Sequence, residues 1–273
     1  MLQVKYARKM SIHPTPLNVR PVRAFSDNYI WLIEAPRGHD QVVAVDPGDA
    51  APVMAELQRS GASLAAILLT HHHPDHVGGV PELLHHWAVP VIGPDDARIA
   101  QRTLTVRDGE RCELQELGLS FETLAVPGHT LSHIAFWGHG ALFCGDTLFS
   151  AGCGRMFEGT PTQMNASLTK LRSLPPDTRM FCGHEYTVAN LRFALTVDPG
   201  NGAALEYQNN VDVVRAKGNP SLPSTMALEI QLNPFLRCDD PTVITAAEAH
   251  AGRSLKDPAE VFGVLRAWKD QFR

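Results

Sequence analysis

The stretch Thr70-His71-His72-His73-Pro74-Asp75-His76 decides the fold of this 273-residue chain. It follows the apolar run Ala65–Leu69, which has the length of a buried β-strand, so we expect a loop between a strand and a helix. Side chains alternate along an extended backbone, so His71 and His73 point the same way and can bind one metal ion. His72 then points elsewhere.

The second half of the motif predicts a second metal site. Pro74 stops the strand from continuing its pairing, and Asp75 and His76 therefore fall at the turn into the next helix, beside the first ion. Clustered histidines neither pack well nor cap helices efficiently, so a structural role explains this run poorly. The motif therefore indicates metal binding.

Three more metal-type residues stand just after other strand-like runs, each preceded by a glycine: His129, Asp146 and His184. Taken alone, a Gly-His or Gly-Asp pair is usually a turn or a cap. In a chain that also carries the motif, a role as metal ligands is favoured over a turn or cap. Loops at one edge of a sheet bring distant residues together, and glycine lets the backbone turn tightly there. Seven candidate ligands can therefore converge. His133, four residues beyond His129, is a candidate to orient a ligand from behind.

Short apolar runs and helical patterns alternate up to about Pro175, which predicts a mixed α/β fold with layered sheet and helix. Helical patterns cover Ala51–Gln58 and Val80–Trp87. The predicted strands are Tyr29–Ile33, Val42–Val45, Ala65–Leu69, Val89–Ile92, Phe121–Val126, Ile134–Trp137, Ala141–Cys144 and Met180–Cys182.

The remainder of the chain reads as a smaller, all-helical unit. Its last helix is the clearest, with Asp257 as N-cap, Pro258 in the first turn and Glu260 completing a capping pattern. One stripe of that helix is apolar, formed by Val261, Val264, Leu265 and Trp268. We therefore expect three parts: an N-terminal extension over residues 1–16, expected to be flexible, a catalytic domain over residues 17–185, and a helical substrate-binding domain over residues 186–273.

Composition excludes several classes of protein. The formal net charge of -5 with interspersed charges provides no basic face for nucleic acid. No apolar run approaches the roughly 20 residues that span a bilayer. The five cysteines are an odd number without metal-type pairing, and no secretory signal is recognisable. We therefore expect a cytoplasmic, monomeric protein with reduced thiols.

The seven candidate ligands resemble, in order, those of the metallo-β-lactamase superfamily. Within it the chain resembles the glyoxalase II (hydroxyacylglutathione hydrolase) family over about residues 17–272. The segments that carry this resemblance are Ser26–Tyr29, Gly145–Phe149, Gly152–Arg155, Phe157–Thr160, Cys182–Tyr186, Asn233–Arg237 and Arg266–Phe272.

The resemblance implies a four-layer α/β/β/α domain followed by a helical domain. It implies that one ion is held by His71, His73 and His129 and the other by Asp75, His76 and His184, with Asp146 bridging them. The implied glutathione contacts are Arg155, Tyr186, Arg266 and Lys269. Two positions depart from the best-known form of the family, which has Lys in place of Arg155 and Tyr in place of Phe157.

The charges of such a site suit thioester hydrolysis. Two divalent ions, two aspartates, one hydroxide and five neutral histidines leave a net charge near +1 by formal counting. Metal coordination lowers the pKa of water toward neutrality, so a metal-bridging hydroxide held beside Asp75 and Asp146 is the expected nucleophile. A thiol of pKa about 8.5 leaves as thiolate without a strong general acid. The expected substrate is S-(2-hydroxyacyl)glutathione, such as S-D-lactoylglutathione.

Other functions share parts of this pattern. A β-lactamase has the same metal site but lacks a helical C-terminal domain. An iron-dependent glutathione persulfide dioxygenase of the same fold is the main alternative enzyme, although its relatives lack the long C-terminal part. A regulatory metal-binding module would be expected to have lost ligands. Zinc is the expected metal, with iron and manganese as alternatives, because imidazole and carboxylate accept all three.

Overall fold

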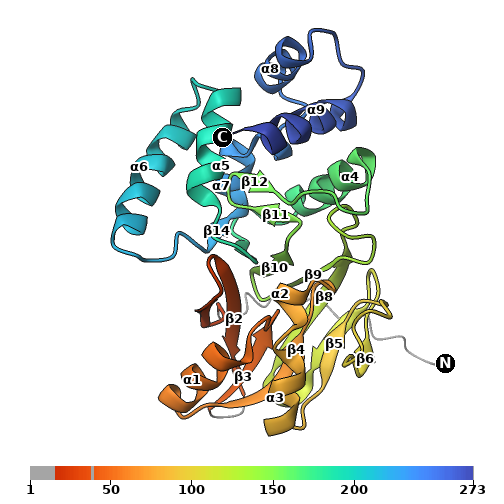
Figure 1. Cartoon of the computed structure of the whole chain (residues 1–273), viewed down its shortest axis with the longest axis vertical. Coiled ribbons are helices and arrows are strands. Elements are labelled where there is room, and N and C mark those ends of the chain that lie inside the picture. Colours follow the sequence, from red (N-terminus) through yellow and green to blue (C-terminus); the bar gives the residue numbers. More distant parts are fainter. Residues whose placement is uncertain (1–15, 38–39, 273) are drawn as a thin grey trace, which may run out of the picture.

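The computed structural model describes residues 16–37 and 40–272. The predicted N-terminal extension, residues 1–16, lies outside this part of the chain except for Pro16. Two six-stranded sheets face each other in the lower half of Figure 1, and a group of helices covers one end. The predicted metallo-β-lactamase-like fold with a helical C-terminal region is confirmed.

The first sheet is mixed and has the strand order β1-β2-β3-β4-β5-β6. Its β1–β2–β3 part is antiparallel, and β3 through β6 run parallel. The strands are β1 (Val19–Ala24), β2 (Asn28–Glu34), β3 (Gln41–Val45), β4 (Ser63–Leu68), β5 (Val91–Gly93) and β6 (Leu104–Thr105).

The second sheet has the order β14-β13-β10-β9-β8-β7, and only β10 and β13 are parallel neighbours. Its strands are β7 (Arg111–Leu114), β8 (Leu119–Ala125), β9 (Ile134–Gly138), β10 (Ala141–Gly145), β13 (Arg179–Cys182) and β14 (Ser224–Thr225). A separate hairpin joins β11 (Leu148–Phe149) to β12 (Gly152–Cys153). The two-residue β14 belongs to the otherwise helical C-terminal region and ties it to this sheet.

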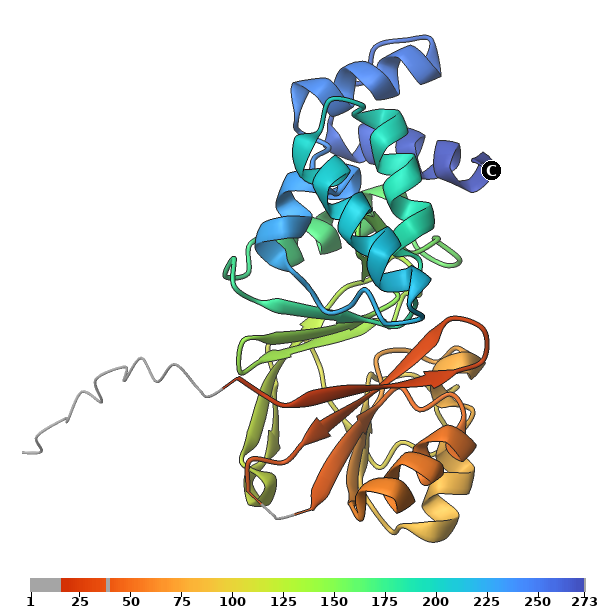
Figure 2. The same cartoon turned by 90° about the vertical axis from the view of Figure 1, so that its left-hand side faces the viewer.

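Strand alternation divides the core into layers. Trp31 and Ile33 of β2 belong to the core shared by the two sheets, whereas Ile30 and Leu32 belong to the core under the first sheet's helices. Those helices are α1 (Ala50–Ser60) and α3 (Val80–His86), which cover the outer face of the first sheet (Figure 2). This period-two pattern explains why β2 is buried on both faces.

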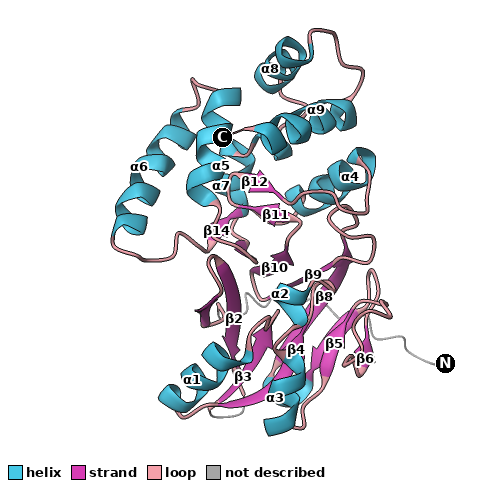
Figure 3. Ribbon diagram, viewed as in Figure 1, coloured by secondary structure: helices cyan, strands magenta, loops and turns pink. Residues whose placement is uncertain are grey.

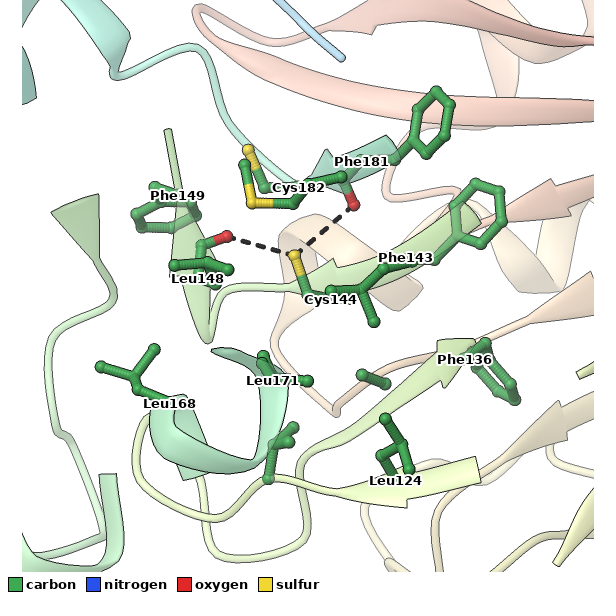
Figure 4. Close-up of a cluster of buried hydrophobic side chains, with 14 of the residues drawn as sticks. Leu124, Phe136, Phe143, Cys144, Leu148, Phe149, Leu168, Leu171, Phe181 and Cys182 are labelled. Carbon is green, nitrogen blue, oxygen red and sulfur yellow. Dashed lines mark hydrogen bonds between the residues drawn. The ribbon is translucent and has the colours of Figure 1, made fainter. Parts of the chain in front are cut away.

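Helix α4 (Pro161–Arg172) covers the second sheet. Figure 4 shows its Leu168 and Leu171 in the same buried cluster as Phe143, Cys144 and Phe181 of strands β10 and β13. The Cys144 thiol donates to the carbonyl oxygens of Leu148 and Phe181. All five cysteines lie buried and unpaired within the described residues, consistent with the expected reduced thiols.

The C-terminal region is predominantly helical (Figure 3). It contains α5 (Thr187–Val197), α6 (Gly202–Ala216), α7 (Met226–Leu232), the 3-10 turn η2 (Pro234–Leu236), α8 (Pro241–Ala251) and α9 (Pro258–Gln271). Asp257 caps α9 as predicted by accepting from the Glu260 amide, but the Glu260 carboxylate accepts from Lys256 rather than from the cap residue. The apolar side chains of Val261, Phe262 and Leu265 lie on the buried face of α9. Across the described residues, no helix is both long and apolar enough to cross a membrane.

Candidate metal centre

The motif lies where the sequence predicted it, between β4 and the short helix α2 (Pro74–Val77). His71 is fully buried, and His73 occupies the N-cap position of α2 in extended conformation. Asp75 and His76 follow in the first turn of that helix, with His76 buried. The switch from extended to helical backbone at Pro74 therefore turns both halves of the motif toward one place.

The other three candidate ligands follow strands of the second sheet. His129 comes after β8, Asp146 directly after β10 and His184 after β13. All three preceding glycines lie where a Cβ would be too close to other atoms, and at Gly128 it would meet the Met164 sulfur at 2.4 Å. A Cβ at Gly145, whose φ is +47°, would meet the Thr70 hydroxyl at 2.3 Å, and one at Gly183 would meet an Asp146 carboxylate oxygen at 2.6 Å.

The structure brings six of the seven residues together in two groups of three, each with its ligand atoms within 4.8 Å of one another. The first group is His71, His73 and His129, in which His73 Nδ1 lies 3.0 Å from His129 Nε2. The second group is Asp75, His76 and His184, in which Asp75 Oδ2 lies 3.5 and 3.4 Å from the two Nε2 atoms.

Asp146 lies between the two groups. Its Oδ2 is 3.5 Å from His129 Nε2 in the first group and 3.2 Å from His184 Nε2 in the second, and its Oδ1 is 3.4 Å from His76 Nε2. One carboxylate is therefore within reach of ligand atoms on both sides.

Three of these ligand atoms are buried without a hydrogen-bond partner among the described residues: His71 Nε2, His76 Nε2 and Asp146 Oδ1. An unsatisfied buried polar atom costs about 1–3 kcal/mol. His71 belongs to the first group, His76 to the second, and Asp146 lies between them, so cations bound by the two groups would satisfy all three atoms. The donor set of imidazole nitrogens and carboxylate oxygens suits divalent transition metals, so the residues fit a binuclear metal site.

In four of the imidazoles the Nδ1 atom contacts a hydrogen-bonding partner, which leaves the Nε2 atom free for a metal. His184 Nδ1 lies 2.8 Å from Asp27 Oδ1, and His76 Nδ1 lies 3.0 Å from Asp46 Oδ2.

The first group has neutral partners instead. His129 Nδ1 lies 2.7 Å from the Arg155 carbonyl oxygen, and His71 Nδ1 lies 3.0 Å from the Thr70 hydroxyl. Among the described residues, the direct partners behind these imidazoles are thus carboxylates in the second group and neutral oxygens in the first.

Protonation follows the same division. Burial lowers the pKa of His71 well below its usual value and that of His73 to about 4, so both imidazoles are neutral, as metal ligands must be. Burial also lowers the pKa of His184, but the charge of Asp146 and hydrogen bonds to Asp146 and Asp75 outweigh it and raise the pKa to about 10. A proton and a metal cation therefore compete for His184.

The remaining motif histidine points away from the centre, as predicted. His72 lies 3.4 Å from Asp96 and 3.7 Å from Glu158. Arg98 forms ion pairs with both of these carboxylates. The candidate orienting residue, His133, is fully buried. Its ring stacks on His71 with centroids 4.5 Å apart, and its Nε2 accepts from the Asp146 amide at 3.1 Å.

A cleft of about 640 Å³ opens from the metal ligands toward the helical region. All four predicted glutathione contacts line it: Arg155, Tyr186, Arg266 and Lys269. The Tyr186 ring stacks on His184, with centroids 4.8 Å apart and planes 4° from parallel. Arg155 is largely exposed and lies 3.3 Å from Asp270. Phe157, also exposed, contacts the His73 and His129 rings edge-on.

The two cations of α9 differ from each other. Arg266 is buried, donates to the Cys153 carbonyl oxygen at 2.8 Å and to Asp270 at 3.1 Å, and keeps one buried Nε without a partner among the described residues. Lys269 is half-buried and donates to the Ala189 carbonyl oxygen at 2.9 Å. Burial, followed by the nearby charge of Arg266, lowers the pKa of Lys269 to about 8.

Sequence reasoning missed the carboxylates and the amide that support the centre. Asp46 accepts from the Thr70 amide and hydroxyl as well as contacting His76, and Asn28 donates to Asp75 at 3.0 Å. Asp46 could have been found from the sequence, because it directly follows β3, the parallel neighbour of the motif strand β4, and so falls at the same sheet edge. Asp27 ends the turn before β2 and Asn28 is the first residue of that strand, and the pairing of Asn28 with His184 forms only when the two sheets pack together.

Two family models together match nearly the whole described chain. The metallo-beta-lactamase superfamily model matches residues 24–184, and the model described as hydroxyacylglutathione hydrolase C-terminus matches residues 185–272.

Similar curated proteins match along their full length. Proteins named hydroxyacylglutathione hydrolase from Nitrosomonas eutropha, Idiomarina loihiensis and Cupriavidus taiwanensis are 48%, 50% and 51% identical to this chain. The alignments cover 94%, 93% and 94% of this chain and 100%, 99% and 100% of the relatives.

Solved structures share the fold. ETHE1 from Myxococcus xanthus superposes with a TM-score of 0.60 at 23% identity, covering 94% of this chain and 100% of that one. TTHA1623, solved in a di-iron-bound form, superposes with a TM-score of 0.55 at 27% identity, covering 82% and 100%. With the fold, the clustered His and Asp ligands and full-length relatives about half identical, this chain belongs to the hydroxyacylglutathione hydrolase family of the metallo-β-lactamase superfamily.

Proposed function

We propose that this chain hydrolyses S-(2-hydroxyacyl)glutathione thioesters, such as S-D-lactoylglutathione, to glutathione and a 2-hydroxy acid. One observation carries the proposal: a single cleft joins the clustered metal ligands to the cations Arg155, Arg266 and Lys269. The first part suits attack on a carbonyl, and the second suits an anionic substrate. The names of the relatives agree with this reaction.

The proposed metal ligands are His71, His73 and His129 for one ion and Asp75, His76 and His184 for the other, with Asp146 as the shared ligand. Two divalent ions held there would lower the pKa of a bound water and so supply a hydroxide nucleophile near neutral pH. Zinc is the proposed metal, because imidazole-rich sites suit it. Iron and manganese are the alternatives, and TTHA1623 is a related protein with two irons.

The chain's own residues would orient the reaction. Asp27, Asp46 and the Arg155 carbonyl fix the imidazoles of His184, His76 and His129, so the ligands need little reorganisation. At the other end of the cleft, Lys269 and Arg155 would bind the glutathione carboxylates, and Tyr186 would supply a hydroxyl. The departing thiolate needs no dedicated acid residue.

The proposal is tested by metal analysis of the purified protein together with thiol release from S-D-lactoylglutathione. Two equivalents of metal and metal-dependent thiol release are expected. Oxygen consumption with glutathione persulfide, in place of thioester hydrolysis, would assign the chain to the alternative iron-dependent oxidation. A protein with two metals and neither activity would contradict both enzymatic functions.

Two organisational features accompany the proposal. We propose a division into a catalytic domain over residues 17–185 and a substrate-binding domain over residues 186–273, supported by family models that meet at residues 184 and 185. We also propose a monomer in the cytoplasm, supported by five buried thiols that suit a reducing compartment. Light scattering and cell fractionation test these last two points.

A further inference from the structure

The hairpin β11–β12 forms part of the cleft wall and has an unusual turn. Its two turn residues, Ser150 and Ala151, are buried, and Ala151 has a φ of +57°. The left-handed region is unfavourable for a residue with a Cβ and persists where the surroundings impose it. The hairpin therefore depends on contacts from outside itself.

Those contacts come from three side chains of the helical region. Asn190 of α5 donates to the Ser150 carbonyl oxygen at 3.0 Å. Asn233, after α7, donates to the carbonyl oxygens of Phe149 and Gly152 at 3.2 and 3.0 Å. Glu229 of α7 accepts from the Ala151 amide at 2.8 Å. Each side chain contacts the hairpin backbone, so the helical region fixes its position.

Glu229 is the centre of this arrangement. It is completely buried, and the hydrogen-bond partners of both its carboxylate oxygens are uncharged. Its Oε1 accepts from the hydroxyls of Ser150 and Ser224 at 2.8 and 2.5 Å, and its Oε2 accepts from the Ala151 amide and from Asn233 at 2.8 and 3.1 Å. Burial of this carboxyl group is costly and raises its pKa, and the four hydrogen bonds partly offset that cost.

The hairpin connects the two ends of the cleft. Phe149 lies 5.3 Å from Tyr186 and 5.9 Å from His184, measured between ring centroids. The Cys153 carbonyl oxygen accepts from Arg266, and Arg155 follows two residues later. A displaced hairpin would therefore move the anchors of the predicted glutathione contacts. Among the metal ligands, His129 is held by the carbonyl oxygen of Arg155 in this same segment, whereas His76 and His184 are held by Asp46 and Asp27, outside the hairpin.

We propose that Glu229 is a positioning residue, which acts through the β11–β12 hairpin to place the glutathione-binding side of the cleft relative to the metal centre. This inference rests on the proposed function. It assigns to a residue far from the reacting atoms an effect on substrate binding rather than on the chemical step.

Two serine variants form a matched pair, because each removes one hydroxyl donor from the same Glu229 oxygen. Ser150→Ala loosens the hairpin, whereas Ser224→Ala removes a donor that stands on β14, outside the hairpin. Both should lower the Tm. Only Ser150→Ala should raise KM for S-D-lactoylglutathione, by about threefold to tenfold, with kcat and metal content unchanged.

Glu229 itself gives the larger effect. Glu229→Ala should raise KM about tenfold or more. Glu229→Gln should stay within about threefold of wild type, because its amide oxygen can still accept from Ala151 and Asn233 while both serine hydroxyls can rotate to accept from its NH₂ group. If Glu229→Ala does not fold, the serine pair still decides the question.

Binding of S-methylglutathione, a thioether that cannot be hydrolysed, measures recognition without turnover. Its Kd by calorimetry should rise in Ser150→Ala and not in Ser224→Ala. Equal changes in the two variants, or a loss of kcat with unchanged KM, would reduce Glu229 to a purely structural role and overturn the inference. A wild-type protein that neither binds this thioether nor hydrolyses the thioester would instead refute the proposed function.

Discussion

The two ends of the cleft are built differently. At the metal end, short side chains stand at strand ends, and the imidazoles of His76 and His184 are each held from behind by a carboxylate. At the glutathione end, the long side chain of Lys269 reaches over the rings of Phe193 and Phe272 and donates a hydrogen bond to a backbone carbonyl.

This difference separates chemistry from binding. A small displacement of a group that acts on the reacting atoms costs much of the rate, so rigid supports belong at the metal end. Contacts to a distant part of the substrate act almost equally in the ground and transition states, so a flexible cation suffices at the other end. We therefore expect variants of the metal end to change metal content and kcat, and variants of the glutathione end to change KM.

The largest effect is expected from Asp146→Asn. Removing the charge of the one carboxylate that reaches both ligand groups leaves two cations less screened from each other, so at least one should bind more weakly. We expect metal content to fall and kcat to drop by roughly 10³-fold or more. His72→Ala is the control, because His72 points away from the centre, and it should retain both metals. Full turnover and two bound metals in Asp146→Asn would contradict the assignment of Asp146 as the shared ligand.

The next effect tests the supports behind the ligands. Asp27→Asn keeps a hydrogen-bond acceptor for His184 but removes the charge, and should weaken metal binding at the second ligand group by about 10- to 100-fold, measured by chelator competition. Asp96→Asn is a matched control, since Asp96 is a buried carboxylate beside the non-ligand His72. Equal metal loss in both variants would show that general destabilisation, rather than support of a ligand, is responsible.

A smaller effect is expected at the glutathione end. A lost hydrogen bond to a charged group costs about 1.5–3 kcal/mol, so Lys269→Ala should raise KM for S-D-lactoylglutathione by about 10- to 100-fold and spare kcat. Because Lys269 is partly exposed to solvent, we expect the increase in KM to be near the lower end of this range. A small neutral thioester should be hydrolysed unchanged. Lys256→Ala removes an exposed cation outside the cleft and should have no effect. Loss of kcat alone in Lys269→Ala would contradict a binding role.

The smallest effect is a pH dependence. With a pKa lowered to about 8 by burial and by Arg266, Lys269 is protonated below that pH and neutral above it. Affinity for an anionic substrate should therefore be fully present below pH 8 and decline as the pH rises through 8, seen as a rising KM. Asp270 and Cys153 oppose the shift and do not reverse it. Lys269→Arg, which stays charged, should remove this rise; its persistence would assign the titration to another group.

Much of the fold and of the centre could be predicted from local patterns. The short apolar runs located β2, β3, β4, β8, β9 and β10 to within a few residues, and a capped apolar stripe located α9. The short strands β6, β11, β12 and β14 could not be predicted, because a strand of two residues is too short to show a periodic pattern. The motif and three Gly-preceded residues named the members of both ligand groups, since each stands at the end of a recognisable strand.

By itself the sequence determined the fold class, the seven clustered residues and the helix that carries Arg266 and Lys269, because these follow from side-chain alternation, helix capping and strand ends within short stretches of chain. Only the tertiary structure decided that Asp27 supports His184, that Arg266 is buried against the Cys153 carbonyl, and that Glu229 holds the β11–β12 hairpin. Such contacts join residues about 80 to 160 positions apart. They arise when the two sheets and the helical region pack together, and no local pattern records which polar groups that packing leaves opposite one another.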